Sequence, residues 1–164
     1  SIHKHFTYGM MTTRGILNGS DAYAVRTVRG ARYRLIWNLN YETRFTNACT
    51  QSGHFRSMVA AAKAGDAKAA DLAHRYQNRP QYELYDCVAD PWEMRNVASD
   101  PRFAHVVREH KEKLETWMAS QGDRGVEMEL DALLHQGRFR GLTRAQADQA
   151  WRKRRVQSRR KKKS

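Results

Sequence analysis

The stretch YAVRTVRGARYRLIWNLN, residues 23–40, constrains the fold most, because two runs with strand periodicity meet at Gly30. Large or β-branched side chains occupy alternate positions in both runs: Tyr23, Val25, Thr27, Tyr33, Leu35, Trp37 and Leu39. A period of two places such side chains on one face of a strand, with the arginines on the other. The pattern predicts a β-hairpin whose apolar face needs a cover.

A helix over residues 101–119 is the predicted cover. Asp100 is a good N-cap and Pro101 fits the first helical position. The apolar residues fall on one helical face: Phe103, Val106, Val107, His110, Leu114, Trp117 and Met118. We expect His110, inside this stripe, to be a packed histidine with one hydrogen bond and not a catalytic group.

The remaining patterns complete an α+β fold. Alternation predicts strands at residues 6–10 and 81–86, and helical stripes occupy 54–65 and 66–78, with Asp66 as the cap of the second. A short helix is expected within 126–139. We therefore predict a small antiparallel sheet of about four strands, packed against a long C-terminal helix and carrying a helical insertion.

The net charge of +13 is concentrated near the C-terminus. Residues 138–163 hold twelve basic side chains and one acid, Asp148, whereas the rest of the chain has 18 basic and 16 acidic residues. We predict a body at 1–125 and a basic extension at 126–164, helical near 143–151 and then disordered. Binding of nucleic acid or another polyanion by this extension is the alternative function, although its only aromatic residues are Phe139 and Trp151.

Five carboxylates lie between Tyr82 and Pro101. Asp90, Pro91 and Glu93 are spaced as the N-cap, first position and capping-box acid of a helix, and we expect an Asx-turn at Asp86. A calcium loop and a pair of catalytic carboxylates are the alternatives. The acids are not at alternate positions and no glycine lies among them, so capping is favoured.

The two cysteines, Cys49 and Cys87, form no CxxC pair and have no zinc-ligand spacing. We expect them to be buried small residues, although a disulfide between them stays open. The sequence contains no run of about 18 apolar residues, so it predicts no membrane span. Ser1 opens directly onto a strand-like pattern, as if the chain were cut from a longer protein.

Several segments together resemble the sulfatase family. The segment YELYDCVADPWEMRNVASDPRF (82–103) is similar to its C-terminal signature, and residues 23–40 resemble the hairpin that precedes this signature. The segments MMTTRGI, NLNYETRFTNA and WMASQGDRG resemble the heparan N-sulfatase (N-sulfoglucosamine sulfohydrolase) branch. The resemblance covers about residues 1–125. It implies that the chain is the C-terminal subdomain of an alkaline-phosphatase-like α/β sulfatase.

The resemblance also implies where the chemistry lies. The family needs a Cys/Ser-x-Pro-x-Arg motif, whose first residue becomes formylglycine, and a calcium ion held by Asp and Asn side chains. Neither Cys49 nor Cys87 begins that motif. In the family the metal ligands come from the upstream domain, so the resemblance implies no catalytic and no metal-binding residue in this chain. We expect an upstream catalytic sulfatase domain as its partner, and no activity from the chain alone. The compartment expected from the resemblance is periplasmic, secreted or lysosomal.

The substrate that the resemblance implies is a sulfamate or sulfate ester on a sulfated sugar of heparan type. In the family, the segment before the C-terminal hairpin approaches the substrate pocket, which here is MMTTRGI. We expect Thr12 and Thr13 to donate to sugar hydroxyls. Arg14 is expected to pair with a sulfate or carboxylate of a glycosaminoglycan.

Overall fold

The computed structural model describes residues 5–16 and 18–161, the last three of them by their backbone alone. The chain divides into two compact units. The sheet unit contains residues up to Met11, Ala24–Tyr41 and Pro80–Val126. The helical unit contains Thr12–Tyr23, Glu42–Arg79 and the residues from Glu127 onward.

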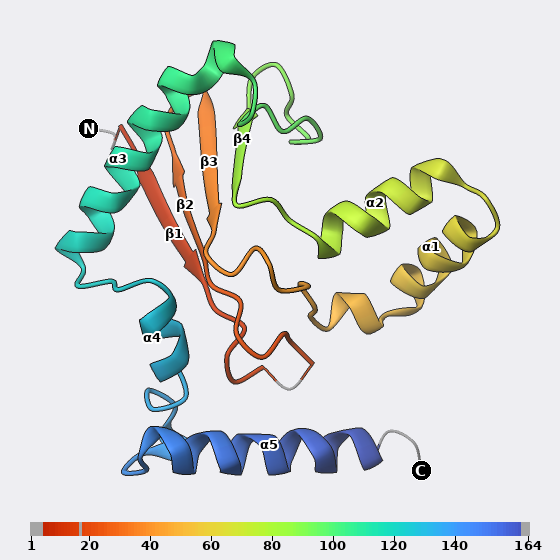
Figure 1. The fold of residues 1–164 in the computed structure, drawn as a ribbon, viewed down its shortest axis with the longest axis vertical. Coiled ribbons are helices and arrows are strands. Elements are labelled where there is room, and N and C mark those ends of the chain that lie inside the picture. The colour runs from red at the N-terminus through yellow and green to blue at the C-terminus, as the bar shows by residue number, and fades with distance from the viewer. Residues whose placement is uncertain (1–4, 17, 162–164) are drawn as a thin grey trace. The chain divides into compact units, whose positions relative to one another are not determined.

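The sheet unit is built on four antiparallel strands (Figure 1). In sheet order these are β1 (Thr7–Met11), β2 (Val25–Arg29), β3 (Tyr33–Asn38) and β4 (Tyr82–Asp86). The register pairs Val28 with Leu35 and Leu35 with Leu84, so these three side chains share one face. The predicted α+β class with a four-stranded antiparallel sheet is confirmed.

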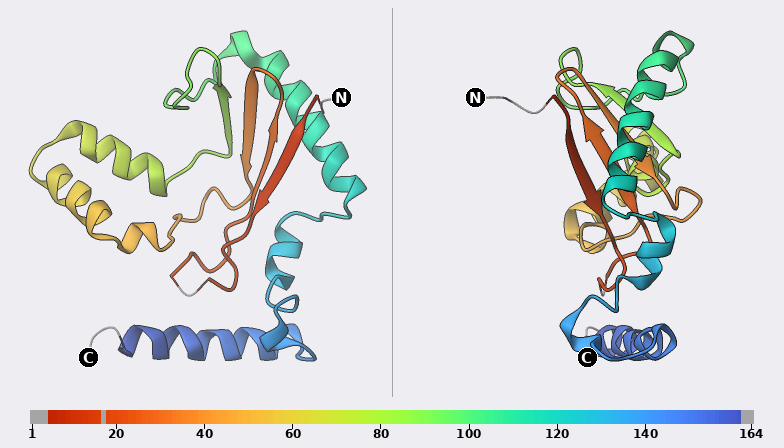
Figure 2. Two further views of the ribbon diagram at one scale, coloured as in Figure 1. Left: turned by 180° about the vertical axis from the view of Figure 1, so that it is seen from behind. Right: turned by 90° about the vertical axis from the view of Figure 1, so that its left-hand side faces the viewer.

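Helix α3 (Ala104–Ser120) runs across one face of this sheet (Figures 1 and 2). A 3₁₀ turn at Pro101–Phe103 leads into it, and the Asp100 side chain accepts from the N–H of Arg102 as the predicted cap. The shared core contains Val28, Leu35, Leu84, Val97, Val106, Leu114 and Met118. Burying each of these side chains stabilises the unit by about 1.5–3 kcal/mol before entropy is counted, so α3 is the cover that the hairpin requires.

His110 is a packed residue of α3, as predicted. Its side chain is 5% exposed, and its Nδ1 lies 3.0 Å from the carbonyl oxygen of Val106 one turn earlier. The rings of Phe6 and Tyr33 meet the imidazole edge to face.

The inner face of β2 is not the predicted one. Val28 packs against α3, and Arg26, two residues earlier, points to the same side of the strand. The side chains of Val25 and Thr27 therefore point away from α3. Arg26 is nevertheless only 2% exposed, because it forms an ion pair with the equally buried Asp123 just beyond α3. Its Nη2 also donates to Asp123 Oδ1 at 3.1 Å. A neutralising partner thus allows an arginine on the apolar face, which alternation alone does not reveal.

The protonation of Asp123 reflects this pairing. Burial by itself would raise the pKa of this carboxyl group. Hydrogen bonds from Arg26 and from the N–H of Gly125, together with the charge of Arg26, outweigh burial and lower the pKa. The carboxylate is therefore charged at neutral pH and compensates the buried guanidinium.

The predicted helix after Asp90 does not form, so the capping-box interpretation of Asp90 and Glu93 is wrong. Residues 87–99 are turns and irregular backbone. Asp90 accepts from the N–H of Arg95 at 2.7 Å, across a turn. Glu93 has a positive φ of 52°, which a helix excludes, and its carboxylate forms an ion pair with Arg34 of β3. The ion pair with Arg34 therefore replaces the capping interaction that was predicted for Glu93.

The Asx-turn expected at Asp86 is confirmed. Its Oδ1 accepts from the N–H groups of Val88 at 3.2 Å and Ala89 at 3.1 Å. Its Oδ2 accepts from Arg32, with Nη2 at 2.7 Å. The Arg32 hydrogen bonds and the Ala89 N–H lower the pKa of Asp86 to about 2.

The helical unit contains a helical hairpin and a C-terminal helix, α5. Its helices are α1 (Gly53–Lys63), α2 (Ala67–Gln77), most of α4 (Val126–Asp131) and α5 (Arg144–Lys161), with 3₁₀ turns at Cys49–Gln51 and Gly137–Phe139. Asp66 caps α2 as predicted, accepting from the N–H of Ala69 at 2.9 Å. Leu133 and Phe139 form a core cluster with Ala147 and Trp151 of α5.

Helix α5 is longer than predicted, because it continues past Trp151 to Lys161. The predicted loss of structure after Trp151 is therefore wrong for residues 152–161, while 162–164 lie outside the described residues. Arginine, lysine and glutamine have high helix propensity, and cations near a helix C-terminus interact favourably with its dipole. These local terms outweigh the like-charge repulsion from which disorder was inferred.

Both cysteines are free thiols. Cys49 is exposed and Cys87 is half-buried, so the expected burial is wrong for Cys49, which begins a surface 3₁₀ turn. Over the described residues, no helix combines the length and apolar character needed to cross a membrane.

Candidate functional site

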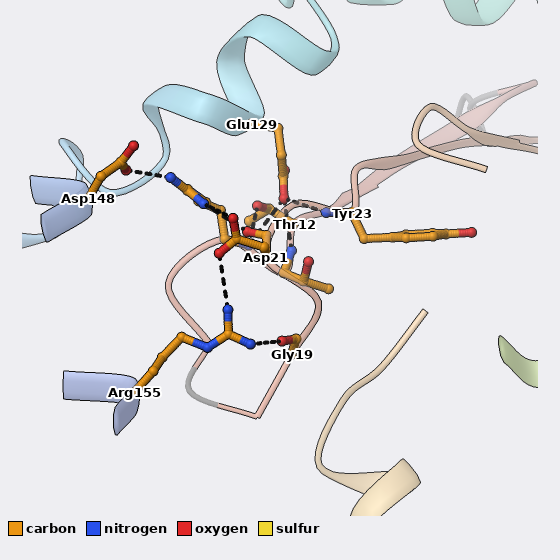
Figure 3. A network of polar contacts seen from close by, with 9 residues as sticks. Thr12, Gly19, Asp21, Tyr23, Glu129, Asp148 and Arg155 are labelled. Carbon is orange, nitrogen blue, oxygen red and sulfur yellow. Dashed lines mark hydrogen bonds and ion pairs between the residues drawn. The ribbon is translucent and has the colours of Figure 1, made fainter. Parts of the chain in front are cut away.

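The loop of residues 12–23, which contains the three predicted substrate contacts, is held by one buried carboxylate of α4. Glu129 Oε1 accepts from the N–H groups of Thr13, Arg14 and Tyr23, each at 3.1 Å (Figure 3). The Glu129 side chain is only 2% exposed. Three charge-assisted bonds to one oxygen fix both ends of the loop, so the backbone at Arg14 is preorganised.

The Arg14 guanidinium is buried between two carboxylates. Nη1 lies 2.9 Å from Asp21 Oδ2 and donates to the Asp21 carbonyl oxygen at 3.2 Å. Nη2 forms an ion pair with Asp148, which projects from α5 (Figure 3). The Arg14 side chain is 3% exposed, whereas those of Asp21 and Asp148 are 55% and 27% exposed. The loop arginine is thus neutralised on the side that faces α5.

A second arginine of α5, Arg155, reaches the same loop. Its Nη1 donates to Asp21 Oδ1 at 3.0 Å, and its Nη2 donates to the carbonyl oxygen of Gly19 at 3.1 Å. Asp21 therefore bridges Arg14 and Arg155 (Figure 3). The result is an alternating network of acids and bases between the loop, α4 and α5.

The structure brings Thr13 and Arg14 together in the buried part of this network and leaves Thr12 at the surface. Thr12 Oγ1 accepts from the Arg14 N–H at 3.3 Å. Thr13 is 2% exposed, and its hydroxyl has no hydrogen-bond partner among the described residues. A substrate anion at Arg14 would have to displace Asp148, so the assignment of these residues to substrate stays a prediction.

Sequence reasoning missed the partners Asp21, Glu129, Asp148 and Arg155. One signal was present for Asp148, because it is the single acid among the twelve cations of residues 138–163. An isolated acid in such a segment indicates a specific counter-charge. Glu129 gave no comparable signal, since nothing in VEMELD separates a buried glutamate from an exposed one.

A polar pocket of about 290 Å³ lies beside this network in the helical unit. Its lining is entirely polar or glycine: Asn18, Gly19, Arg44, Thr46, Thr50, Gln51, Gln77 and Arg155. Two cations and no carboxylate are among these residues, so the pocket presents donors and positive charge.

The metal and the modified cysteine that the resemblance implies do not fit the residues present. In the part of the chain that the structure describes, no three His, Cys, Asp or Glu side chains gather to hold a metal. The acids of residues 82–101 face amide groups or arginines, as at Asp86, Asp90, Glu93 and Asp100. Neither cysteine is followed by proline at the second position.

Comparison with known proteins identifies relatives of one kind. No family model matches. The chain is 30% identical over 119 residues to an ulvan-active sulfatase of Formosa agariphila, covering 73% of this chain and 22% of the relative. It is 34% identical over 100 residues to human N-sulphoglucosamine sulphohydrolase, covering 58% of this chain and 20% of that enzyme.

A solved Bacteroides thetaiotaomicron chain, provisionally described as a sulfatase, aligns with a TM-score of 0.45 at 18% identity. The alignment covers 74% of this chain and 18% of that one. The present chain spans about a fifth of the curated relatives that it matches. Since both of those relatives are sulfatases, the resemblance is confirmed, and the chain belongs to the sulfatase family as a segment homologous to part of such an enzyme.

Proposed function

We propose that this chain is the C-terminal subdomain of a sulfatase that hydrolyses sulfate esters or sulfamates on sulfated sugars of heparan type. The observation that carries the proposal is the match to two sulfatases, one named for ulvan and one for N-sulphoglucosamine, each over about a fifth of its length. Calcium and formylglycine would belong to an N-terminal catalytic domain, because the residues here do not fit either.

In this proposal the subdomain completes the fold and supplies part of the substrate pocket. The support is the fixed loop, since Glu129 holds the backbone on which Thr12, Thr13 and Arg14 stand. Arg14 would pair with a substrate sulfate or carboxylate in exchange for Asp148, and the threonine hydroxyls would donate to the sugar. The chain alone would bind weakly and turn over no substrate.

The test is sulfate release from N-sulfoglucosamine and from ulvan oligosaccharides. We expect none from the 164-residue chain, and turnover from the product of the full reading frame that contains it. In that full product, Arg14→Gln should raise KM at least tenfold, as loss of a charged hydrogen-bond donor does, whereas Arg108→Gln on the exposed face of α3 should not. A reading frame without a Cys/Ser-x-Pro-x-Arg motif before Ser1, or turnover by this chain alone, would contradict the proposal.

Polyanion binding by α5 is the second candidate, favoured by the helical order of its basic segment. A groove of about 650 Å³ runs along one face of α5, lined by Ala145, Asp148, Gln149, Arg152, Lys153, Val156 and Gln157. Arg152, Lys153 and Arg154 are consecutive exposed cations of this helix, and the first two line the groove. Exchanging these three for glutamine should weaken heparin or DNA binding and reduce its salt dependence by up to three phosphate-equivalent contacts. Unchanged binding would exclude this candidate.

A further inference from the structure

The pocket beside Arg44 and Arg155 is independent of the sulfatase assignment. We propose that it is a binding site for a tetrahedral oxyanion, taken either as free sulfate or phosphate or as such a group on one sugar ring. Arginines present planar pairs of N–H donors that match these anions. The two arginines come from segments more than 100 residues apart in sequence, yet they line one pocket.

Arg44 is held in place from both its backbone and its side chain. Its carbonyl oxygen accepts from the Ser20 hydroxyl at 2.9 Å. Its Nη2 donates to Gln77 Oε1, and Gln77 is itself only 6% exposed and accepts from the N–H of Phe45 at 2.8 Å. One nitrogen of the fork is therefore fixed by a buried amide, and Arg44 as a whole remains exposed.

Arg155, which also lines the pocket, is held through its side chain. Each of its terminal nitrogens makes one bond to the loop, to Asp21 or to Gly19. Each NH₂ group carries a second hydrogen, so among the described residues both keep one donor for another acceptor. Asp21 compensates part of the charge of Arg155 but does not line the pocket.

The remaining lining is neutral, and internal hydrogen bonds hold the turn that carries it. Thr50 is fixed by Asn47, whose Oδ1 accepts from the Thr50 N–H at 3.1 Å and whose carbonyl accepts from the Thr50 hydroxyl at 2.7 Å. Gln51 donates to the Asn18 carbonyl at 3.3 Å. A prearranged site loses less entropy when it binds, which matters most for a ligand as small as an oxyanion.

The size of the pocket restricts the ligand. A volume of about 290 Å³ lies at the lower end of the roughly 300–1,000 Å³ range of small-molecule sites. It accommodates an oxyanion, or one ring that carries it, but not a polymer segment. This separates the site from the groove along α5, whose ligand would be a polyanion.

The experiment is an amide NMR titration of the 164-residue chain with sodium sulfate, with sodium phosphate and with glucose 6-sulfate, at constant ionic strength set by NaCl. We expect saturable shifts at residues 44–51 and 18–20, with a Kd on the order of 1 mM. Arg44→Gln should raise this Kd about tenfold, and Arg44→Lys, which keeps the charge without the fork, should have an intermediate effect. The exposed control Arg108→Gln, which removes the same charge from α3, should change it less than twofold.

The three ligands distinguish the source of the oxyanion. Tighter binding of glucose 6-sulfate than of sulfate would place the sugar in the pocket, whereas binding of the free anions alone would mark an inorganic-anion site. Shifts that match those from chloride, or equal weakening by Arg108→Gln and Arg44→Gln, would overturn the proposal. This result would not affect the sulfatase assignment, which rests on turnover by the full protein.

Discussion

Glu129 gives the sharpest test of how the loop of residues 12–23 is held. The Glu129→Gln substitution keeps the shape of the side chain and one acceptor oxygen but removes the charge. A hydrogen bond to a charged group contributes about 1.5–3 kcal/mol and a neutral one about 0.5–1.5 kcal/mol, so each of the three bonds loses about 1 kcal/mol. Because the bonds share one oxygen, we expect a total loss of about 2–3 kcal/mol.

The assay is hydrogen exchange at the amides of Thr13, Arg14 and Tyr23, which donate to this carboxylate. A loss of 2–3 kcal/mol in opening free energy accelerates exchange roughly 30- to 150-fold. The amides of β2 and β3 in the sheet unit should keep their rates. Urea unfolding provides the total effect, and Glu129→Ala, which leaves three buried N–H groups unpaired, should cost about 4–5 kcal/mol.

The matched control is Glu112→Gln, an exposed position of α3, where we expect less than about 0.5 kcal/mol. If Glu129→Gln exchanges as slowly as the wild-type chain, or is as stable as the control variant, the carboxylate does not hold the loop. The reasoning about a preorganised Arg14 would then be refuted.

Three further outcomes follow from other contacts. Arg26→Met should destabilise the sheet unit by about 3–5 kcal/mol, because it leaves Asp123 buried and unpaired, and the double variant with Asp123→Asn should recover part of this loss in urea unfolding. Arg32 lowers the pKa of Asp86 below its unfolded value, so the stability that this contact contributes is present above about pH 4 and is lost as pH falls through about 2. Asp86→Asn should flatten that part of the pH–stability curve. Both cysteines are free, so thiol titration without reductant should count two thiols; a count of zero would indicate a disulfide between them, and a count of one an oxidised site.

The sequence was sufficient to predict the secondary-structure elements whose residue pattern is local and repeated. Alternation located the strands, and a seven-residue apolar stripe with an Asp-Pro start located α3. The errors arose where a distant charge decided the outcome. Glu93 pairs with Arg34 and does not cap a helix, and Arg26 lies on the inner face of β2 because Asp123 neutralises it. Neither pairing has a sequence signature, because the partners are 59 and 97 residues apart.

The same limit applies to the candidate site. The resemblance drew attention to residues 12–14, but the groups that surround them come from the segment after Val126, which carries no resemblance. Loop and extension nevertheless belong to one compact unit. A division of the chain after Gly125 separates the loop from the acids that neutralise it.

The ion pairs of Arg14 with Asp21 and Asp148 determine how Arg14 could bind a substrate. The guanidinium is buried, and leaving it without an anion would cost several kcal/mol. A sulfate or carboxylate that enters would therefore replace Asp148 and not add to it, while Asp21 stays in place on the other nitrogen. The net binding free energy would be the difference between the interaction of Arg14 with the substrate anion and its interaction with Asp148, less the cost of moving α5. Asp148→Asn lowers that cost, so a substrate role for Arg14 requires tighter binding in this variant, whereas a purely structural role requires only a less stable loop.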